Sequence, residues 1–181
     1  MKIANKRSIC RHFLLPLLIA VGSSQANAAE VQVGFSPEGS AEGLVLSVID
    51  NAQQQIRLMG YSFTSPTVVR SLVAAKQRGV DVQIVVDAHG NEGKASQAAL
   101  NIIANAGIPL RTSTAYKIQH DKVIITDGRN VETGSFNYSA AAAKSNSENA
   151  VVLWDFPGVA DVYLNHWQTR WDLGQPYHSK Y

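Results

Sequence analysis

Hydrophobic residues along the chain follow two spacings that predict different elements. Residues 31–35 alternate apolar and polar side chains with the period of two that is typical of a strand. Four apolar residues then follow the i, i+3, i+4, i+7 spacing of one helix face, which predicts a helix over residues 41–54. The same reasoning predicts strands at 56–63, 80–86, 108–111, 120–126, 131–134 and 148–154, helices at 66–78, 95–106 and 158–171, and a short helical segment at 138–144.

This order of elements predicts the class of fold. Strands and helices alternate up to residue 111, and a hairpin follows. Such a pattern is typical of an α/β domain, with a central mixed, largely parallel β-sheet flanked by helices on both faces. The chain contains no internal repeat and no linker.

The first 28 residues have the parts of a secretory signal peptide. Four basic residues precede the apolar segment 13–21, and Ala26-Asn27-Ala28 provides a cleavage site. The apolar segment is shorter than the roughly 20 residues that span a bilayer, although an uncleaved anchor is the alternative. We therefore expect a signal peptide at residues 1–28, a single catalytic domain at residues 29–181, and a periplasmic or secreted protein.

Cleavage after Ala28 would change the charge of the chain. The whole sequence has 16 Lys and Arg residues against 14 Asp and Glu residues. The signal segment holds four of the bases and none of the acids, so the remaining domain would have a formal net charge of −2. Attraction to a polyanion would therefore depend on local positive groups rather than on a global field. Cleavage also removes Cys10, the only cysteine, and with it any thiol chemistry.

The segment Ile118–Tyr138 contains the residues whose side chains could act in a reaction. His120 and Lys122 are two apart on a predicted strand and share a face. A turn at Asp127-Gly128 predicts a hairpin, after which Ser135 and Asn137 can face back toward the same spot. An imidazole, an ammonium, a hydroxyl and an amide gathered in this way suit an anionic phosphate.

These residues match the HxK(x)4D(x)6GSxN signature of the phospholipase D superfamily without a gap, and the chain resembles its compact, exported Nuc-type endonucleases. The alternative, an ordinary hairpin with a surface His and Lys, leaves the Gly-Ser-x-Asn segment unexplained. The resemblance implies a phospholipase D-like fold and a phosphodiesterase.

The chemistry of a phosphodiester assigns a role to each motif side chain. Neutral His120 can attack phosphorus and form a phosphohistidine. Lys122, Ser135 and Asn137 can stabilise the phosphoryl oxygens. The resemblance implies that Glu148, downstream of the motif, pairs with His120 and orients its ring. No metal or other cofactor is then required, although a metal-dependent His-Asp phosphohydrolase is the competing mechanism.

Other residues near the motif have supporting roles in this interpretation. Asp127 is expected to be architectural, bonding to nearby backbone in the turn, and Gly134 to permit a close backbone approach. Lys117, Arg129 and Lys144 flank the motif and are candidates for contacts with a phosphate backbone.

The motif occurs once, and this predicts a homodimer. One histidine cannot serve as nucleophile and leaving-group acid in the same step, because the two roles need opposite protonation states. Two copies around a two-fold axis would supply one His120 each to a composite site.

The expected partner is DNA, with RNA as a second candidate, and no stable membrane insertion is expected because no membrane-docking helix is evident. The alternatives are a periplasmic phospholipase D or phosphatidyl transferase, and a non-catalytic nucleic-acid-binding module.

Overall fold

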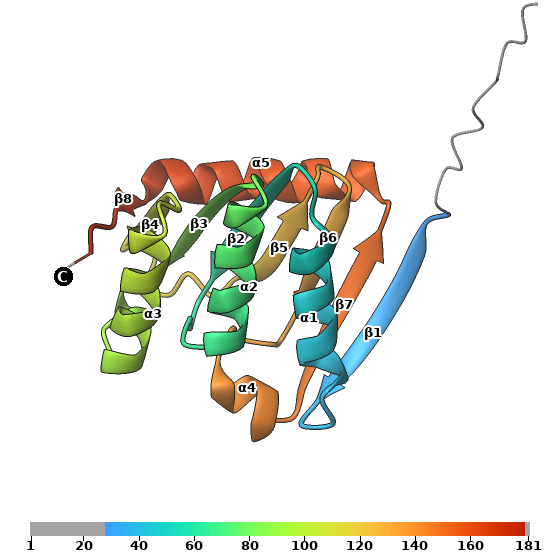
Figure 1. Cartoon of the computed structure of the whole chain (residues 1–181), viewed down its shortest axis with the longest axis horizontal. Coiled ribbons are helices and arrows are strands. Elements are labelled where there is room, and N and C mark those ends of the chain that lie inside the picture. The colour runs from blue at the N-terminus through green and yellow to red at the C-terminus, as the bar shows by residue number, and fades with distance from the viewer. Residues whose placement is uncertain (1–27, 180–181) are drawn as a thin grey trace, which may run out of the picture.

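The computed structural model describes residues 28–179, which form one open sheet covered by helices (Figure 1). The proposed signal peptide lies outside the described residues, apart from Ala28. The strands are β1 (Glu30–Ser36), β2 (Gln55–Gly60), β3 (Asp81–Asp87), β4 (Leu110–Ser113), β5 (Lys122–Thr126), β6 (Asn130–Gly134), β7 (Glu148–Trp154) and β8 (Gln175–Pro176). The helices are α1 (Ser40–Asn51), α2 (Pro66–Gln77), α3 (Lys94–Asn105), α4 (Ala140–Lys144) and α5 (Pro157–Leu173), with a 3-10 turn, η1, at His89–Asn91.

The sheet is mixed, in the order β1-β7-β6-β5-β2-β3-β4-β8. Only β2 with β3 and β3 with β4 pair in parallel, and every other neighbouring pair is antiparallel. The prediction of a mixed sheet is confirmed, whereas the expectation of mostly parallel order is wrong. Helices α1, α2 and α3 connect β1 to β4 in succession, and α5 connects β7 with β8. The β5–β6 hairpin and the short α4 segment instead connect strands that are neighbours in the sheet, which favours antiparallel pairing.

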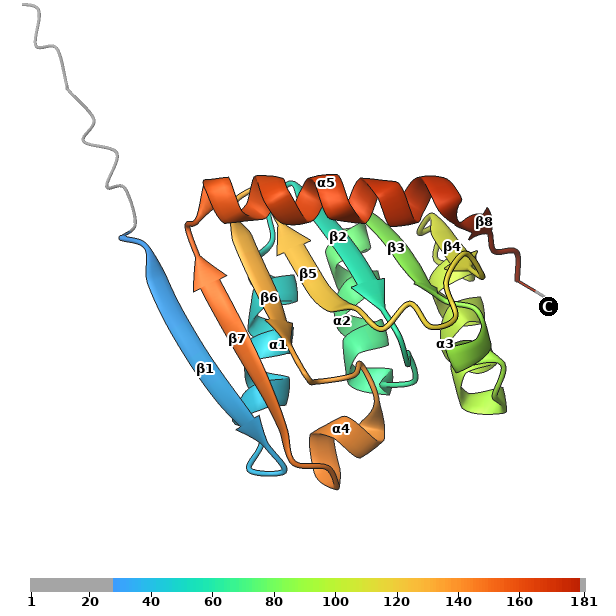
Figure 2. The ribbon, with the colours of Figure 1, turned by 180° about the vertical axis from the view of Figure 1, so that it is seen from behind.

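Helices cover both faces of the sheet, as predicted. Helices α1, α2 and α3 lie side by side on one face, and α5 runs across the other (Figures 1 and 2). The larger core cluster lies under α1–α3 and includes Val45, Ile49 and Leu72, all fully buried. The smaller cluster packs the opposite face against α5, where Trp167 also donates a hydrogen bond to the Leu58 carbonyl at 3.0 Å.

Most predicted elements are confirmed within a few residues, and the differences have local causes. Helix α2 begins after Ser65, whose hydroxyl accepts a hydrogen bond from the Val68 amide, as an N-cap does. The predicted strand at 120–126 begins two residues later, at Lys122, so His120 precedes it. The short β8, which is not among the predicted strands, adds to β4 through only two residue pairs.

The strand pairing gathers the motif at one end of the sheet. Gly60, the last residue of β2, pairs with Lys122, the first of β5. Because β5, β6 and β7 alternate in direction, the end of β6 at Gly134 and the start of β7 at Glu148 come to the same end. This end also receives the end of β1, since Ser36 pairs with Glu148.

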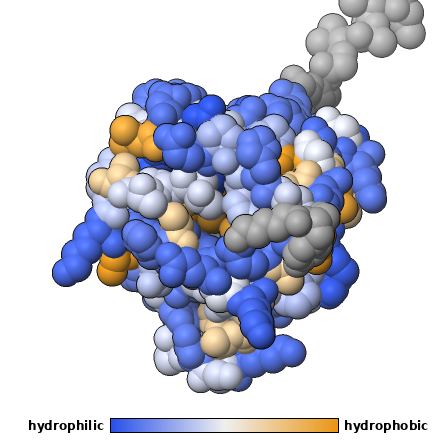
Figure 3. Space-filling view, turned by 90° about the vertical axis from the view of Figure 1, so that its left-hand side faces the viewer, coloured by the Kyte–Doolittle hydropathy of each residue, from blue (hydrophilic) through white to orange (hydrophobic). Residues whose placement is uncertain are grey.

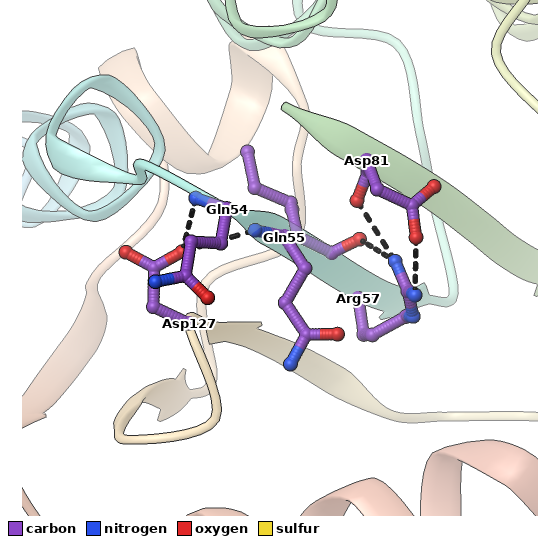
Figure 4. A network of polar contacts seen from close by, with 6 residues as sticks. Gln54, Gln55, Arg57, Asp81 and Asp127 are labelled. Carbon is purple, nitrogen blue, oxygen red and sulfur yellow. Dashed lines mark hydrogen bonds and ion pairs between the residues drawn. The ribbon is translucent and has the colours of Figure 1, made fainter. Parts of the chain in front are cut away.

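Asp127 connects the far end of the hairpin to the start of β2. Its carboxylate accepts hydrogen bonds from the backbone amides of Gln53, Gln54 and Gln55 at 2.7–3.2 Å (Figure 4 shows the contacts to Gln54 and Gln55). The architectural role that we predicted for Asp127 fits this geometry. Its predicted partners are wrong, because the amides belong to a segment more than 70 residues upstream rather than to the turn itself.

The two edges of the sheet differ in surface character. Figure 3 shows the edge at α3 and β8, where hydrophilic side chains cover most of the surface and hydrophobic ones occur in small separate areas. At the other edge, the side chains of Val31, Val33 and Phe35 on β1 are 53–55% exposed.

Within residues 28–179, no helix combines the length and apolar character needed to cross a bilayer.

Candidate active site

An open hollow at the motif end of the sheet brings the predicted catalytic residues together. Its lining consists of His120, Lys122, Gly134, Ser135, Asn137, Glu148 and Asn149. The five residues predicted to act in catalysis therefore share one site, although they come from the segment before β5, from β5 itself, from the turn after β6 and from β7.

Lys122 is the buried cation of this hollow. It is only 6% exposed, and its Nζ donates a hydrogen bond to the His120 carbonyl at 2.8 Å. Burial lowers the pKa of the Lys122 ammonium, while the nearby carboxylates of Asp121 and Glu148 act in the opposite direction. His120 is exposed, so its imidazole is accessible to a substrate entering from solvent.

Glu148 bonds to the motif serine rather than to the motif histidine. Its Oε2 accepts a hydrogen bond from the Ser135 hydroxyl at 2.6 Å, and its Oε1 accepts one from the Asn146 amide at 2.9 Å. Among the described residues, no hydrogen bond joins Glu148 to His120. The predicted pairing is therefore not made in this structure, because the β6–β7 register places the start of β7 against Ser135, whose backbone amide bonds to Asn149.

Gly134 is required by close packing of two backbones. A Cβ at this position would lie 2.3 Å from the Asn149 carbonyl oxygen. The expectation that Gly134 permits a close backbone approach is confirmed. The same approach lets the backbone amide of Asn149 donate a hydrogen bond to Ser135 Oγ at 3.0 Å. Because Ser135 Oγ also donates to Glu148, two hydrogen bonds fix the Ser135 hydroxyl.

Asn137 has an amide oxygen that is buried without a hydrogen-bond partner among the described residues. Its neighbour Phe136 points into the core and is fully buried, as its alternation predicts. Tyr138 is fully buried too, so its ring is not accessible to a nucleic-acid base. The segment after Gly134 thus alternates between core residues and residues that line the hollow.

The three candidate phosphate-contacting residues separate into two groups. Lys117, in the loop before β5, and Lys144, at the end of α4, are exposed and belong to connections at the motif end of the sheet. Arg129 lies in the β5–β6 turn at the opposite end, where its guanidinium pairs with Asp155 at 3.0 Å. The prediction that Arg129 flanks the site is wrong, because β5 and β6 carry the turn away from Lys122.

A fully buried glutamate lies behind the site. Glu132 accepts a hydrogen bond from the Tyr138 hydroxyl at 2.9 Å, and its second oxygen has no partner among the described residues. Burial raises the pKa of Glu132 to about 8, although the hydrogen bond from Tyr138 lowers it. Nothing in the motif spacing indicates this pair.

Tyr61 is a further residue at the site that the motif does not reveal. Its ring centroid lies 5.0 Å from that of His120. His166 of α5 is half-buried, and its Nε2 lies 3.3 Å from Oδ1 of Asp121. Among residues 28–179, no group of three or more His, Cys, Asp and Glu side chains is placed to hold a metal ion.

Comparison with known proteins identifies the family. Residues 45–171 match the family described as "Cardiolipin synthase, PLD-like domain". The crystal structure of a phospholipase D family member, Nuc from Salmonella typhimurium, superimposes with a TM-score of 0.83 at 60% sequence identity, covering 84% of this chain and all of that one.

Two curated relatives differ from Nuc in the names they carry. A phospholipase D of Rickettsia bellii is 35% identical over 147 residues, which are 81% of this chain and 72% of the relative. The human mitochondrial cardiolipin hydrolase is 30% identical over 161 residues, which are 88% of this chain and 63% of the relative. With the family match over most of the domain, these similarities show that the chain belongs to the phospholipase D superfamily and is a phosphodiesterase of that superfamily.

Proposed function

We propose that this phosphodiesterase is a non-specific endonuclease that hydrolyses DNA, with RNA as a second candidate substrate, through a phosphohistidine and without a metal ion. The observation that carries the proposal is the single hollow in which exposed His120 lies beside the buried ammonium of Lys122. Lys122 supplies the positive charge that the phosphoryl oxygens need. The 60% identity to Nuc supports the nuclease branch over the other branches of the superfamily.

The reaction proceeds in two displacements. A ring nitrogen of neutral His120 forms a bond to phosphorus while the bond from phosphorus to the leaving ester oxygen breaks, and this oxygen takes a proton from a second imidazolium. Water then attacks phosphorus and gives its proton to that second imidazole, now neutral, while the phosphorus–nitrogen bond breaks. Asn137 donates a hydrogen bond from its amide nitrogen to the phosphoryl oxygens, and the Ser135 hydroxyl, whose proton Glu148 accepts in this structure, turns that proton toward the phosphoryl oxygens when substrate binds.

The second imidazole is His120 of the partner subunit in a homodimer. An apolar surface suited to the contact lies beside the hollow: Val31, Val33 and Phe35 occupy alternate positions of β1 and therefore share one sheet face. This is the α5 face, because Val31 pairs with Leu153, which packs in the α5 cluster. Figure 2 shows that α5 does not extend over β1. Phe35 pairs with Asn149, which lines the hollow, so this surface reaches the site.

A nucleic-acid backbone fits the surroundings of the hollow. Lys117 and Lys144 are exposed on connections at its end of the sheet and can contact flanking phosphates. No base-reading element is apparent among the described residues, so cleavage is expected to depend little on sequence and to weaken with salt. A lipid phosphodiesterase is the second candidate, since the names of the Rickettsia and human relatives favour it. We place the enzyme in the periplasm or outside the cell, after removal of residues 1–28.

One experiment separates these candidates. Purified protein is incubated in EDTA with plasmid DNA and, separately, with vesicles of phosphatidyl lipid, beside a His120→Ala control. The endonuclease predicts nicking and fragmentation of the plasmid by wild type alone. Cleavage of lipid without cleavage of DNA would establish the phospholipase instead. Loss of all activity in EDTA, with recovery on adding a divalent ion, would refute the metal-independent route.

A further inference from the structure

The ring of Tyr61 lies close to the imidazole of His120 and to the ammonium of Lys122. Its centroid is 5.0 Å from that of the His120 imidazole, with the two planes tilted by 54°. The Nζ atom of Lys122 lies 5.5 Å from the same Tyr61 centroid, within the range of a cation–π attraction. This contact follows from the sheet, because Tyr61 directly follows Gly60, the residue that pairs with Lys122.

The turn Asp87–Asn91 holds Tyr61 from the other side. A Cβ on Gly90 would lie 2.7 Å from Cε2 of the Tyr61 ring, so only glycine leaves room for the ring in this position. The Asn91 side chain donates to the Tyr61 carbonyl at 2.6 Å and accepts from the Phe63 amide at 2.9 Å. Both the ring and the backbone of Tyr61 are therefore fixed by one turn.

The same turn holds the segment that carries His120. The buried carboxylate of Asp87 accepts from the Gly90 amide at 2.6 Å and from the Gln119 amide at 2.7 Å. Gln119 immediately precedes His120. One turn thus sets the position of Tyr61 relative to His120, although the two residues are 59 positions apart in sequence.

We propose that Tyr61 is a positioning residue for the phosphodiesterase reaction: its ring restricts the imidazole of His120 and holds the ammonium of Lys122 over the hollow. The inference rests on the phosphohistidine reaction proposed above. The hydroxyl has no part in it, because no hydrogen bond joins the Tyr61 hydroxyl to the rest of the described chain. The ring is therefore the feature that matters, and phenylalanine should replace tyrosine.

Steady-state kinetics on bis(4-nitrophenyl) phosphate test this role without assuming a DNA or a lipid substrate. Tyr61→Phe is expected to keep kcat within about twofold of wild type, whereas Tyr61→Leu lowers kcat roughly tenfold or more with KM changed less than about threefold. A Tyr61→Phe variant as slow as Tyr61→Leu would overturn the proposal, because the hydroxyl would then act. A rise in KM at unchanged kcat would also overturn it and make Tyr61 a substrate contact.

Gly90→Ala provides a second test that keeps the tyrosine. The added methyl group displaces the ring, so kcat should fall in the wild-type background. In a Tyr61→Leu background the same change should cost a smaller factor in kcat than in the wild type, because the ring contacts at 2.7 and 3.0 Å are gone and only the 3.1 Å approach to the carbonyl of residue 61 remains. An equal loss of kcat in both backgrounds would overturn the proposal. Circular dichroism and thermal unfolding confirm that each variant is folded.

The failure of this inference can be told apart from failure of the reaction on which it rests. Mass spectrometry of acid-free denatured samples detects the nitrophenyl-phosphoryl adduct on His120 during turnover. Turnover by wild type through a route without this adduct would overturn the proposed reaction and the inference with it. Normal adduct formation by both wild type and Tyr61→Leu, at equal rates, would overturn only the role of Tyr61.

Discussion

Replacing Glu132 with glutamine should change how the stability of the protein depends on pH. The Glu132 side chain is fully buried, and its β6 position pairs with Ile124 on one side and Val152 on the other. It accepts one hydrogen bond, from Tyr138, and its other oxygen has no partner among the described residues. An ionised carboxylate at this position would have only the Tyr138 hydrogen bond to offset the free-energy cost of losing its hydration. The folded protein therefore holds Glu132 protonated. Glutamine has nearly the same shape as the protonated acid and does not titrate.

The magnitude follows from the pKa of Glu132, which burial raises from 4.5 to about 8. Between these pH values the unfolded chain releases the proton and the folded protein keeps it. The free energy of unfolding therefore falls as pH rises through this window, by about 1.4 kcal/mol per pH unit and by about 5 kcal/mol in total. The contribution of Glu132 to the free energy of unfolding is fully present below pH 4.5 and is lost by the time the pH has risen through about 8.

Urea denaturation at pH 5, 6.5 and 8 measures this effect. Between pH 5 and pH 8 the wild type should lose about 3–4 kcal/mol more than Glu132→Gln. Glu38→Gln, at an exposed turn position, is the matched control and should follow the wild type. Tyr138→Phe should extend the loss of stability to higher pH, because the Tyr138 hydrogen bond lowers the pKa of Glu132. Parallel curves for wild type and Glu132→Gln would show that the buried carboxyl does not titrate as argued.

Four further predictions concern the hairpin and the site. Asp127→Ala should lower the free energy of unfolding by about 2–3 kcal/mol in urea titrations, because three backbone amides lose their acceptor. Gly134→Ala should lower kcat roughly tenfold or more, since the methyl group forces β6 from Asn149 and displaces Ser135; normal kinetics would contradict this packing. Val33→Lys, on the exposed face of β1, should give a monomer of low activity in sedimentation and kinetic assays, and an active monomer would refute the composite site. The pKa of the Lys122 ammonium should lie below 10.5, because burial lowers it; NMR titration of the Lys122 side chain in the free protein measures this pKa.

The hairpin and the contents of the site could be predicted because they depend on short-range geometry. Lys122 and Ser135 lie within one hairpin, so the strand period and the position of the turn decide how close they come. The same period correctly sends Phe136 into the core. The strand period does not predict the position of Arg129 relative to the site. A residue that is close to the motif in sequence can still lie at the opposite end of a strand, as Arg129 does beside Asp155.

The sheet order and the surface of α5 depend on long-range packing, which periodicity does not report. The apolar stripe of α5 includes Val162, which is 68% exposed, whereas Trp167 is buried. A stripe shows which residues can be buried, but the neighbouring elements decide which ones are. Because α5 crosses the sheet without reaching over β1, apolar residues at that side are left on the surface (Figure 2). We infer that this excess of exposed apolar residues is the part of the fold that a second subunit completes.

The support of the motif also lies far from it in sequence. Asp127 bonds to the start of β2, and Tyr61 follows the end of β2, so this one strand contacts the hairpin at both ends. Between them, the antiparallel pairing of β2 with β5 fixes the distance along the strand. The motif spacing predicts which groups meet the phosphate, but the rigidity of their arrangement depends on β2. Substitutions at the two ends should therefore differ in kind: loss of the Asp127 contact should lower stability, whereas loss of the Tyr61 ring should lower kcat.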